Sequence, residues 1–253
     1  MHYLATADTD IGIEKNVNQD SLLIKHVSYD CGEVLMAIMC DGMGGLTKGE
    51  LASATVIREF SNWFDQEMPF ELMDVDMHAI GGKWSMFLKN LNTRLIEYGQ
   101  RNNCNLGTTF SGILFIGNEY VVVHVGDSRI YQINSAITQL TTDQTFVARE
   151  IRRGNMTPEQ GKVDKRRNLL LQCIGASRIV HPEIIHGKSE QGVYLLCSDG
   201  FRNEITEKEM YESLTFDNLV SKQAMHSNVT YLIEQAKSRK ERDNISAILV
   251  KVE

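Results

Sequence analysis

The order in which strand-like and helix-like patterns follow one another constrains the fold of this chain most. Short apolar runs at 22–27 and 34–40 come first, and two long stretches with apolar residues every three or four positions follow. Strand patterns return at 107–116, 120–125, 129–133 and 193–197, and a last strand pattern at 245–252 follows further helices. Such blocks, without regular strand-helix-strand alternation, favour an α+β fold with antiparallel sheets. Turns at 117–118 and 126–128 predict that residues 107–133 form an antiparallel meander.

The helical stretches each present one apolar face. The faces consist of Ala52, Val56, Phe60, Trp63 and Phe64; of Trp84, Phe87, Leu88, Leu91, Leu95 and Tyr98; and of Met225, Val229, Leu232, Ile233 and Ala236. Residues 142–190 are less regular, with a helix expected at 144–153 and a second one from Pro158. A basic run occupies 162–167, and it is interpreted either as a solvated loop or as a surface for acidic or phosphorylated segments.

Length and composition predict one compact domain over 1–253 in the cytoplasm. The chain has 26 Lys and Arg against 33 Asp and Glu, a net charge of −7, which argues against nucleic acid as a partner. Its five cysteines form no CxxC pair, so a reducing compartment is expected. The N-terminus lacks a signal-peptide pattern, and no apolar run reaches the ~18–20 residues of a membrane span.

Aspartates stand where the apolar strands begin or end. Asp20 precedes the run at 22–27, Asp41-Gly42 follows 34–40, Asp199-Gly200 follows 193–198, and Asp243 precedes 245–252. Each one alone is typical of a turn. Asp41-Gly42 and Asp199-Gly200, however, lead into helical patterns rather than into a hairpin partner. Carboxylates on rigid strand ends suit a cation with oxygen ligands, Mg²⁺ or Mn²⁺, whereas the seven scattered histidines do not suggest zinc.

Six short motifs in order resemble those of the metal-dependent type 2C protein Ser/Thr phosphatases, in particular the bacterial single-domain branch. They span nearly the whole chain from about residue 5. The motifs are Gly12-x-x-Lys15-x-x-Asn18-Gln19-Asp20, Asp41-Gly42-Met43-Gly44-Gly45, Gly126-Asp127-Ser128-Arg129, Leu140-Thr-Thr-Asp143, Cys197-Ser198-Asp199-Gly200 and Arg242-Asp243-Asn244.

The resemblance implies a central β-sandwich of two antiparallel sheets with helix layers on both faces, and a two-metal site at one end. Asp41 would bridge two Mn²⁺ or Mg²⁺ ions, with the Gly42 carbonyl on one and Asp199 and Asp243 on the other. Asp20 would bind metal waters, and Asp143 would hold a third, weaker ion. Residues 144–172, the flap, would lie beside the site with Asn168 at its returning edge. Asp127 and Arg129 would form a tight turn with a buried ion pair.

The implied activity is hydrolysis of phosphoserine and phosphothreonine by a metal-activated water. Asp41, Asp20 and Lys15 are the expected catalytic residues. The implied partners are phosphoproteins, above all a eukaryotic-like Ser/Thr kinase and its substrates, and a monomer that binds no nucleic acid and no membrane is expected. A catalytically silent phosphoprotein-binding or kinase-regulating module is the alternative function.

Three positions depart from the family pattern. Lys15 replaces an arginine that often binds the substrate phosphate, so it keeps the charge without the bidentate fork. Met43 stands where animal members carry a histidine, and it cannot donate a proton. The leaving alkoxide would then take its proton from a metal-bound water or from solvent. Gln144 stands where histidine is common, which we expect to affect local flap geometry only.

Overall fold

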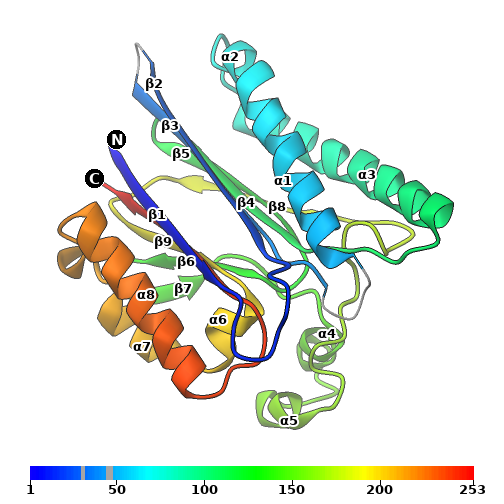
Figure 1. Cartoon of the computed structure of the whole chain (residues 1–253). Coiled ribbons are helices and arrows are strands. Elements are labelled where there is room, and N and C mark those ends of the chain that lie inside the picture. The colour runs from blue at the N-terminus through cyan, green and yellow to red at the C-terminus, as the bar shows by residue number, and fades with distance from the viewer. Residues whose placement is uncertain (30–31, 44–47) are drawn as a thin grey trace.

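Two antiparallel sheets packed face to face form the centre of the molecule (Figure 1). The computed structural model describes residues 1–29, 32–43 and 48–253. Asp30, between the first two apolar runs, and Gly44 and Gly45 of the second motif lie outside these residues. The first sheet has the order β1 (Tyr3–Asp10), β10 (Ile245–Val252), β9 (Gly192–Cys197), β6 (Arg129–Ile133) and β7 (Ile137–Gln139). The second has the order β2 (Ser21–Tyr29), β3 (Gly32–Cys40), β4 (Phe110–Ile116), β5 (Glu119–Val125) and β8 (Glu183–Lys188).

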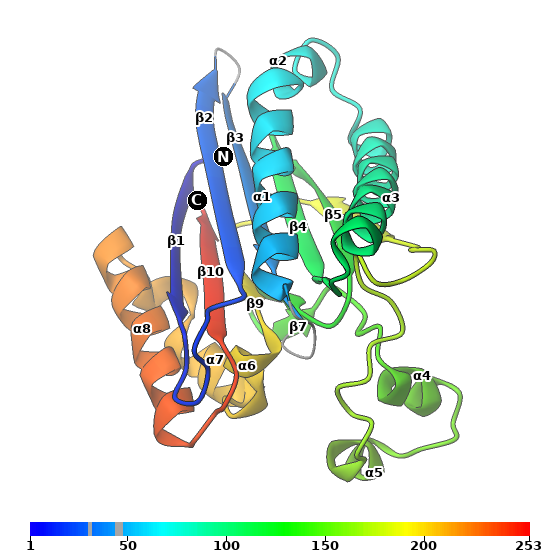
Figure 2. The same ribbon diagram turned by 45° about the vertical axis from the view of Figure 1, so that its right-hand side comes forward.

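Helices cover the outer face of each sheet, which confirms the predicted α+β sandwich (Figures 1 and 2). The second sheet carries α1 (Gly49–Gln66), α2 (Met68–Glu71) and α3 (Met77–Asn102). The first carries α6 (Asp199–Asn203), α7 (Glu207–Ser213), a 3₁₀ turn (Phe216–Asn218) and α8 (Lys222–Ser238). The short helices α4 (Phe146–Arg152) and α5 (Pro158–Val163) belong to the flap and stand apart from the sandwich in Figure 2.

The layering explains the apolar runs. In β3, Val34, Met36 and Ile38 face the helices while Leu35, Ala37 and Met39 face the other sheet, so that both faces are buried. An inner strand of this kind requires a continuous apolar run instead of an alternating one, which is why it was recognisable in the sequence.

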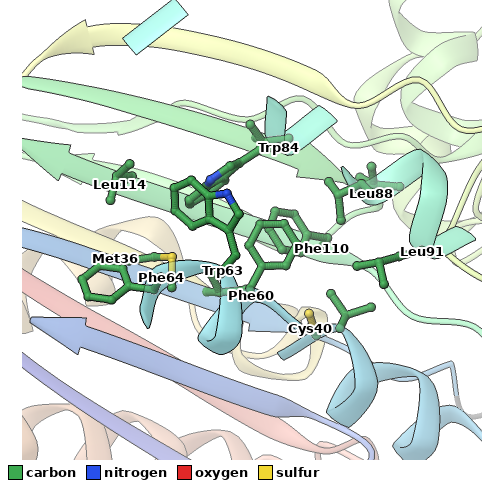
Figure 3. Packing of buried hydrophobic residues seen from close by; sticks show 14 of the residues in the cluster. Met36, Cys40, Phe60, Trp63, Phe64, Trp84, Leu88, Leu91, Phe110 and Leu114 are labelled. Carbon is green, nitrogen blue, oxygen red and sulfur yellow. The ribbon is translucent and has the colours of Figure 1, made fainter. Parts of the chain in front are cut away.

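The predicted apolar faces of α1 and α3 pack on the second sheet, and that of α8 packs on the first. Phe60 of α1 contacts Trp84 of α3 edge to face, with ring centroids 5.1 Å apart, and Phe110 of β4 lies beneath them (Figure 3). The predicted faces of α1 and α8 are buried. On α3, however, Tyr98 is 44% exposed, because the apolar stripe ends before it.

The predicted meander is wrong in its third strand. β4 and β5 do pair as a hairpin, but β6 pairs with β9 in the other sheet, so residues 126–128 connect the two sheets. The strand predicted at 107–116 begins only at Phe110, because Thr108 and Thr109 bond instead to Ile174 and Asp41.

Within the described residues, no helix has the length and apolarity needed to cross a lipid bilayer.

Candidate active site

The end of β3 fixes Asp41 through its backbone. The Asp41 carbonyl accepts hydrogen bonds from the Thr109 amide (2.8 Å) and the Thr108 hydroxyl (2.9 Å), and its amide donates to Thr109 Oγ1 (3.0 Å). The next residue must be glycine, because a Cβ on Gly42 would lie 2.5 Å from the Gln19 carbonyl oxygen. The predicted bridging carboxylate therefore follows a rigid strand end, as expected from its sequence context.

Asn244 ties the loop that carries Lys15 and Asp20 to the start of β10. Its Oδ1 accepts from the Gln19 amide (2.9 Å), and its Nδ2 donates to the carbonyls of Ile11 (2.9 Å) and Val17 (3.2 Å). Two residues later, in β10, the Ser246 hydroxyl donates to Asp20 Oδ2 at 2.6 Å. Asp20 and Asp243 are thus held beside each other although 223 positions separate them in sequence.

Asp199 is the first residue of α6, and Gly200 allows this helix to approach the Asp243–Asn244 backbone. A Cβ on Gly200 would lie 2.2 Å from the Asn244 carbonyl oxygen and 3.4 Å from Asp243 Cβ. At the second Asp-Gly pair, the glycine therefore allows the start of α6 to contact the chain just before β10. This contact brings Asp199 against Asp243.

The four predicted aspartates influence one another electrostatically. Burial, with the charges of Asp199 and Asp243, raises the pKa of Asp20 to about 7. Burial and the neighbouring carboxylates also raise the pKa of Asp41 well above its ordinary value, and burial raises that of Asp199 despite the nearby Arg202 guanidinium. Buried carboxylates that repel one another are stabilised by a cation.

The donor set fits a divalent ion with oxygen ligands. Among the described residues, no three His, Cys, Asp or Glu side chains form a ready-made cage for one ion. An ion here would be coordinated by pairs of carboxylates, by the Gly42 carbonyl and by water. Mg²⁺ is usually bound in this way in proteins, because it keeps several of its water ligands.

Lys15 lies in this cluster and is not a free surface cation. Its Nζ is 2.6 Å from Asp243 Oδ1. Burial favours the neutral amine, but the contact with Asp243 and the charges of Asp41 and Asp199 raise the pKa of Lys15. A permanent positive charge therefore stands beside the carboxylates.

The predicted ion pair between Asp127 and Arg129 is wrong. Arg129 instead binds both oxygens of Asp143, through Nε (2.8 Å) and Nη2 (2.7 Å), because β6 places its side chain toward residues 139–143. Asp127 lies 3.6 Å from Nη2 of Arg202, and burial raises the pKa of Asp127 to about 7. The role of Asp143 as a third metal ligand stays a prediction, and a cation there would compete with Arg129.

Arg202 is a site residue that the sequence reasoning missed. It extends from α6, donates to the Asp127 carbonyl (3.0 Å) and lies 3.8 Å from Asp143 Oδ2. The sequence offered only a weak signal for it, a cation three residues after Asp199, which is a common pattern on any helix surface.

A cavity of about 900 Å³ separates the flap from this end of the sandwich. Asp127, Asp143 and Asp199 line one side of it, and Asn168 lines the flap side. The flap's returning chain is anchored where Phe146 donates to the Leu169 carbonyl and Leu171 donates to the Gln144 carbonyl, both at 2.8 Å. Asn168 is therefore placed just before the anchored segment.

Gln144 does more than expected. Its Oε1 accepts from the Gly126 amide (2.8 Å) and from Gln172 Nε2 (2.7 Å), so one side chain joins the start of the flap, its end and the turn between the two sheets.

Known proteins share both the sequence pattern and the fold. A sequence model of the protein phosphatase 2C family matches residues 13–249. The chain is 30% identical over 248 residues to the serine/threonine protein phosphatase PstP of Mycobacterium tuberculosis. This alignment covers 97% of the chain but 44% of the relative, so the chain spans less than half the length of that protein.

Solved structures of Ser/Thr phosphatases share the fold of this chain. The Ser/Thr phosphatase Stp1 from Staphylococcus aureus superposes with a TM-score of 0.86 at 28% identity, covering 100% of this chain and 96% of that one. The catalytic domain of PstP in complex with two manganese ions gives 0.79 at 27% identity, covering 98% and 97%. Since the family model matches nearly the whole chain, this protein belongs to the protein phosphatase 2C family.

Proposed function

We propose that this chain is a metal-dependent phosphatase that hydrolyses phosphoserine and phosphothreonine in proteins. The observation that carries the proposal is the convergence of Asp20, Asp41, Asp199 and Asp243 from four separate strand ends onto one partly buried, mutually repelling cluster. Family membership and the two manganese ions in the PstP catalytic domain support it.

Each residue has a defined part in the proposed site. Asp41, the Gly42 carbonyl, Asp199 and Asp243 would hold two Mn²⁺ or Mg²⁺ ions, Asp20 would orient water, and Asp143 would hold a third ion. Two bound ions would supply an acidified water nucleophile and neutralise the phosphate charge. Lys15 would bind a phosphate oxygen as a point charge, since its Nζ already lies among the carboxylates. Met43 offers no proton, so this side chain would not protonate the leaving group.

The catalytically silent module has no comparable support. Such a module does not need a partly buried carboxylate cluster, whose repulsion costs stability unless a cation is bound. All four aspartates are present, and the relatives that match carry phosphatase names.

The decisive experiment measures hydrolysis of phosphoserine, phosphothreonine and phosphotyrosine peptides with Mn²⁺, Mg²⁺ or chelator. We expect turnover of the first two with metal, and loss of at least about a hundredfold in kcat for Asp199→Asn, since one metal-binding charge is removed. Asp74→Asn, an exposed aspartate before α3, is the matched control and should retain wild-type rates. Turnover that persists after complete metal removal would refute the mechanism.

The proposal extends to the domain organisation, the oligomeric state, the substrates and the location of the protein. We infer one domain over 1–253 with the flap at 144–172, a monomer, and a Ser/Thr kinase among the substrates. The four described cysteines, at 40, 104, 173 and 197, are all free thiols, in keeping with the proposed cytoplasmic location. Dephosphorylation of an autophosphorylated Ser/Thr kinase and light scattering of the purified chain would test the partner and the monomer.

A further inference from the structure

The flap side of the 900 Å³ cavity is basic. Arg152 at the end of α4, Lys162 in α5 and Arg167 after α5 all line it, whereas Asp199 lies on the opposite wall. The volume is at the upper end of the ~300–1,000 Å³ typical of ligand sites, so the cavity accommodates more than a phosphate group.

The basic character is concentrated in the flap. Residues 144–172 contain seven Lys and Arg against three Asp and Glu, a net charge of +4, although the whole chain carries −7. An acidic ligand is therefore repelled by most of the surface and attracted to the flap.

Among the described residues, the three flap cations that line the cavity, Arg152, Lys162 and Arg167, have no ion-pair partner. Elsewhere in the flap, Arg149 and Arg153 pair with Glu150, and Arg166 pairs with Asp164. Within the part of the chain that the structure describes, Arg152, Lys162 and Arg167 form no ion pair and no side-chain hydrogen bond. Their charges are available to a ligand.

The flap holds these cations on an ordered framework. Its two ends pair through Thr145 and Leu170, and α5 begins with a capping box at Thr157. Gly161 of α5 packs against Val147 and Ile151 of α4, where a Cβ would lie 2.7 Å from Val147 Cγ1. Arg152 and Lys162 therefore stand on two packed helices, and Arg167 stands in the segment after α5, where its amide donates to the Asp164 carbonyl at 3.1 Å.

We propose that this basic wall binds negative charge in the substrate segment next to the phosphorylated residue. The preferred substrates are then phosphoserine or phosphothreonine segments with acidic side chains or a second phosphate nearby. This inference rests on the proposed function, because it places the phosphate to be cleaved at the Asp199 side of the same cavity.

The test compares phosphothreonine peptides that differ only in the flanking residues: neutral, glutamate-rich, lysine-rich, or carrying a second, non-hydrolysable phosphonate. Wild-type protein should favour the anionic peptides over the neutral one in kcat/KM by roughly three- to thirtyfold, as three exposed ion pairs allow. The preference should diminish at high salt, since exposed charges are screened. The glutamate and phosphonate peptides distinguish carboxylate from phosphate as the recognised group.

Two variants locate the effect. The triple change Arg152→Glu, Lys162→Glu and Arg167→Glu should reverse the order, so that the lysine-rich peptide becomes the better substrate. Lys165→Glu is the matched control, because Lys165 is an exposed flap cation that does not line the cavity, and it should keep the wild-type order.

Equal kcat/KM for all peptides, or a preference that the triple variant leaves unchanged, would overturn the inference while the phosphatase activity stands. Absence of turnover of every peptide and of p-nitrophenyl phosphate with Mn²⁺ would instead refute the proposed function.

Discussion

Replacing Asn244 by alanine should weaken both the fold and the metal site. Asn244 is 3% exposed, and its side chain makes three hydrogen bonds, to the carbonyls of Ile11 and Val17 and from the Gln19 amide. These bonds connect the start of β10 to the loop before β2. Each such bond contributes about 0.5–1.5 kcal/mol net, and an unsatisfied buried partner costs more. Because water can reach part of the freed loop, we expect a loss of about 2–4 kcal/mol in the free energy of unfolding.

Urea denaturation in chelator measures this loss without a contribution from bound metal. A Mn²⁺ titration of the same variant, followed by thermal unfolding, then reports the metal affinity. We expect the affinity to fall at least about tenfold, since the loop that carries Asp20 is no longer held against Asp243.

Asn92→Ala is the matched control. Asn92 is also 3% exposed and makes two backbone hydrogen bonds, to the Ser177 carbonyl (2.9 Å) and from the Gly175 amide (2.7 Å), but it lies on α3 away from the aspartates. It should lose comparable stability and keep its Mn²⁺ affinity. If Asn244→Ala costs less than about 0.5 kcal/mol, or if both variants lose Mn²⁺ affinity equally, the role assigned to Asn244 is refuted.

Three further predictions concern the same end of the sandwich. Lys15→Ala should raise KM for p-nitrophenyl phosphate roughly tenfold, because Nζ lies 2.6 Å from Asp243 within the site and is placed to bind the phosphate. Lys15→Arg should restore the wild-type KM. If Lys15→Ala leaves the kinetics unchanged, Lys15 is a structural cation only. Burial and the charges of Asp199 and Asp243 raise the pKa of Asp20 to about 7 in the folded protein, so in chelator the free energy of unfolding should fall as pH rises from about 4 to about 7. Asp20→Asn should reduce this fall in urea titrations at a series of pH values. Gly200→Ala should cost about 1–3 kcal/mol, because its Cβ would lie 2.2 Å from the Asn244 carbonyl oxygen. Gly82→Ala is the control, because a Cβ at Gly82 would have no other atom within 4 Å, and it should not reduce the free energy of unfolding. If Gly200→Ala and Gly82→Ala change the stability equally, the packing argument for Gly200 is contradicted.

The inner strands and long helices could be predicted from the sequence because burial on both sides leaves a strong pattern. β10 was predicted with its observed bounds, Ile245–Val252, and every residue in it is buried. The apolar faces of α1 and α8 likewise match the buried residues.

The strands that were missed are all at sheet edges. β1 and β7 flank the first sheet and β8 flanks the second. An edge strand is covered on fewer sides, so its side chains need not be apolar, and β1 reads as a mixed segment of small and polar residues. Its place depends on pairing with β10, at the other end of the chain.

For the candidate site, the sequence by itself determined the residue types and their positions at strand ends. Aspartate before or after a buried strand, next to glycine or asparagine, is visible without a structure. The fold then decided which of them meet, since Asp20 and Ser246 bond across 226 positions in the chain.

Only the tertiary structure decided the pairing of the remaining charges. Arg129 binds Asp143 and not Asp127, Arg202 takes part without any distinctive motif, and Arg152, Lys162 and Arg167 stay unpaired on one wall of the cavity. Side-chain charges interact over a few ångströms in three dimensions and leave no periodic trace along the chain, whereas burial of a whole strand or helix face does.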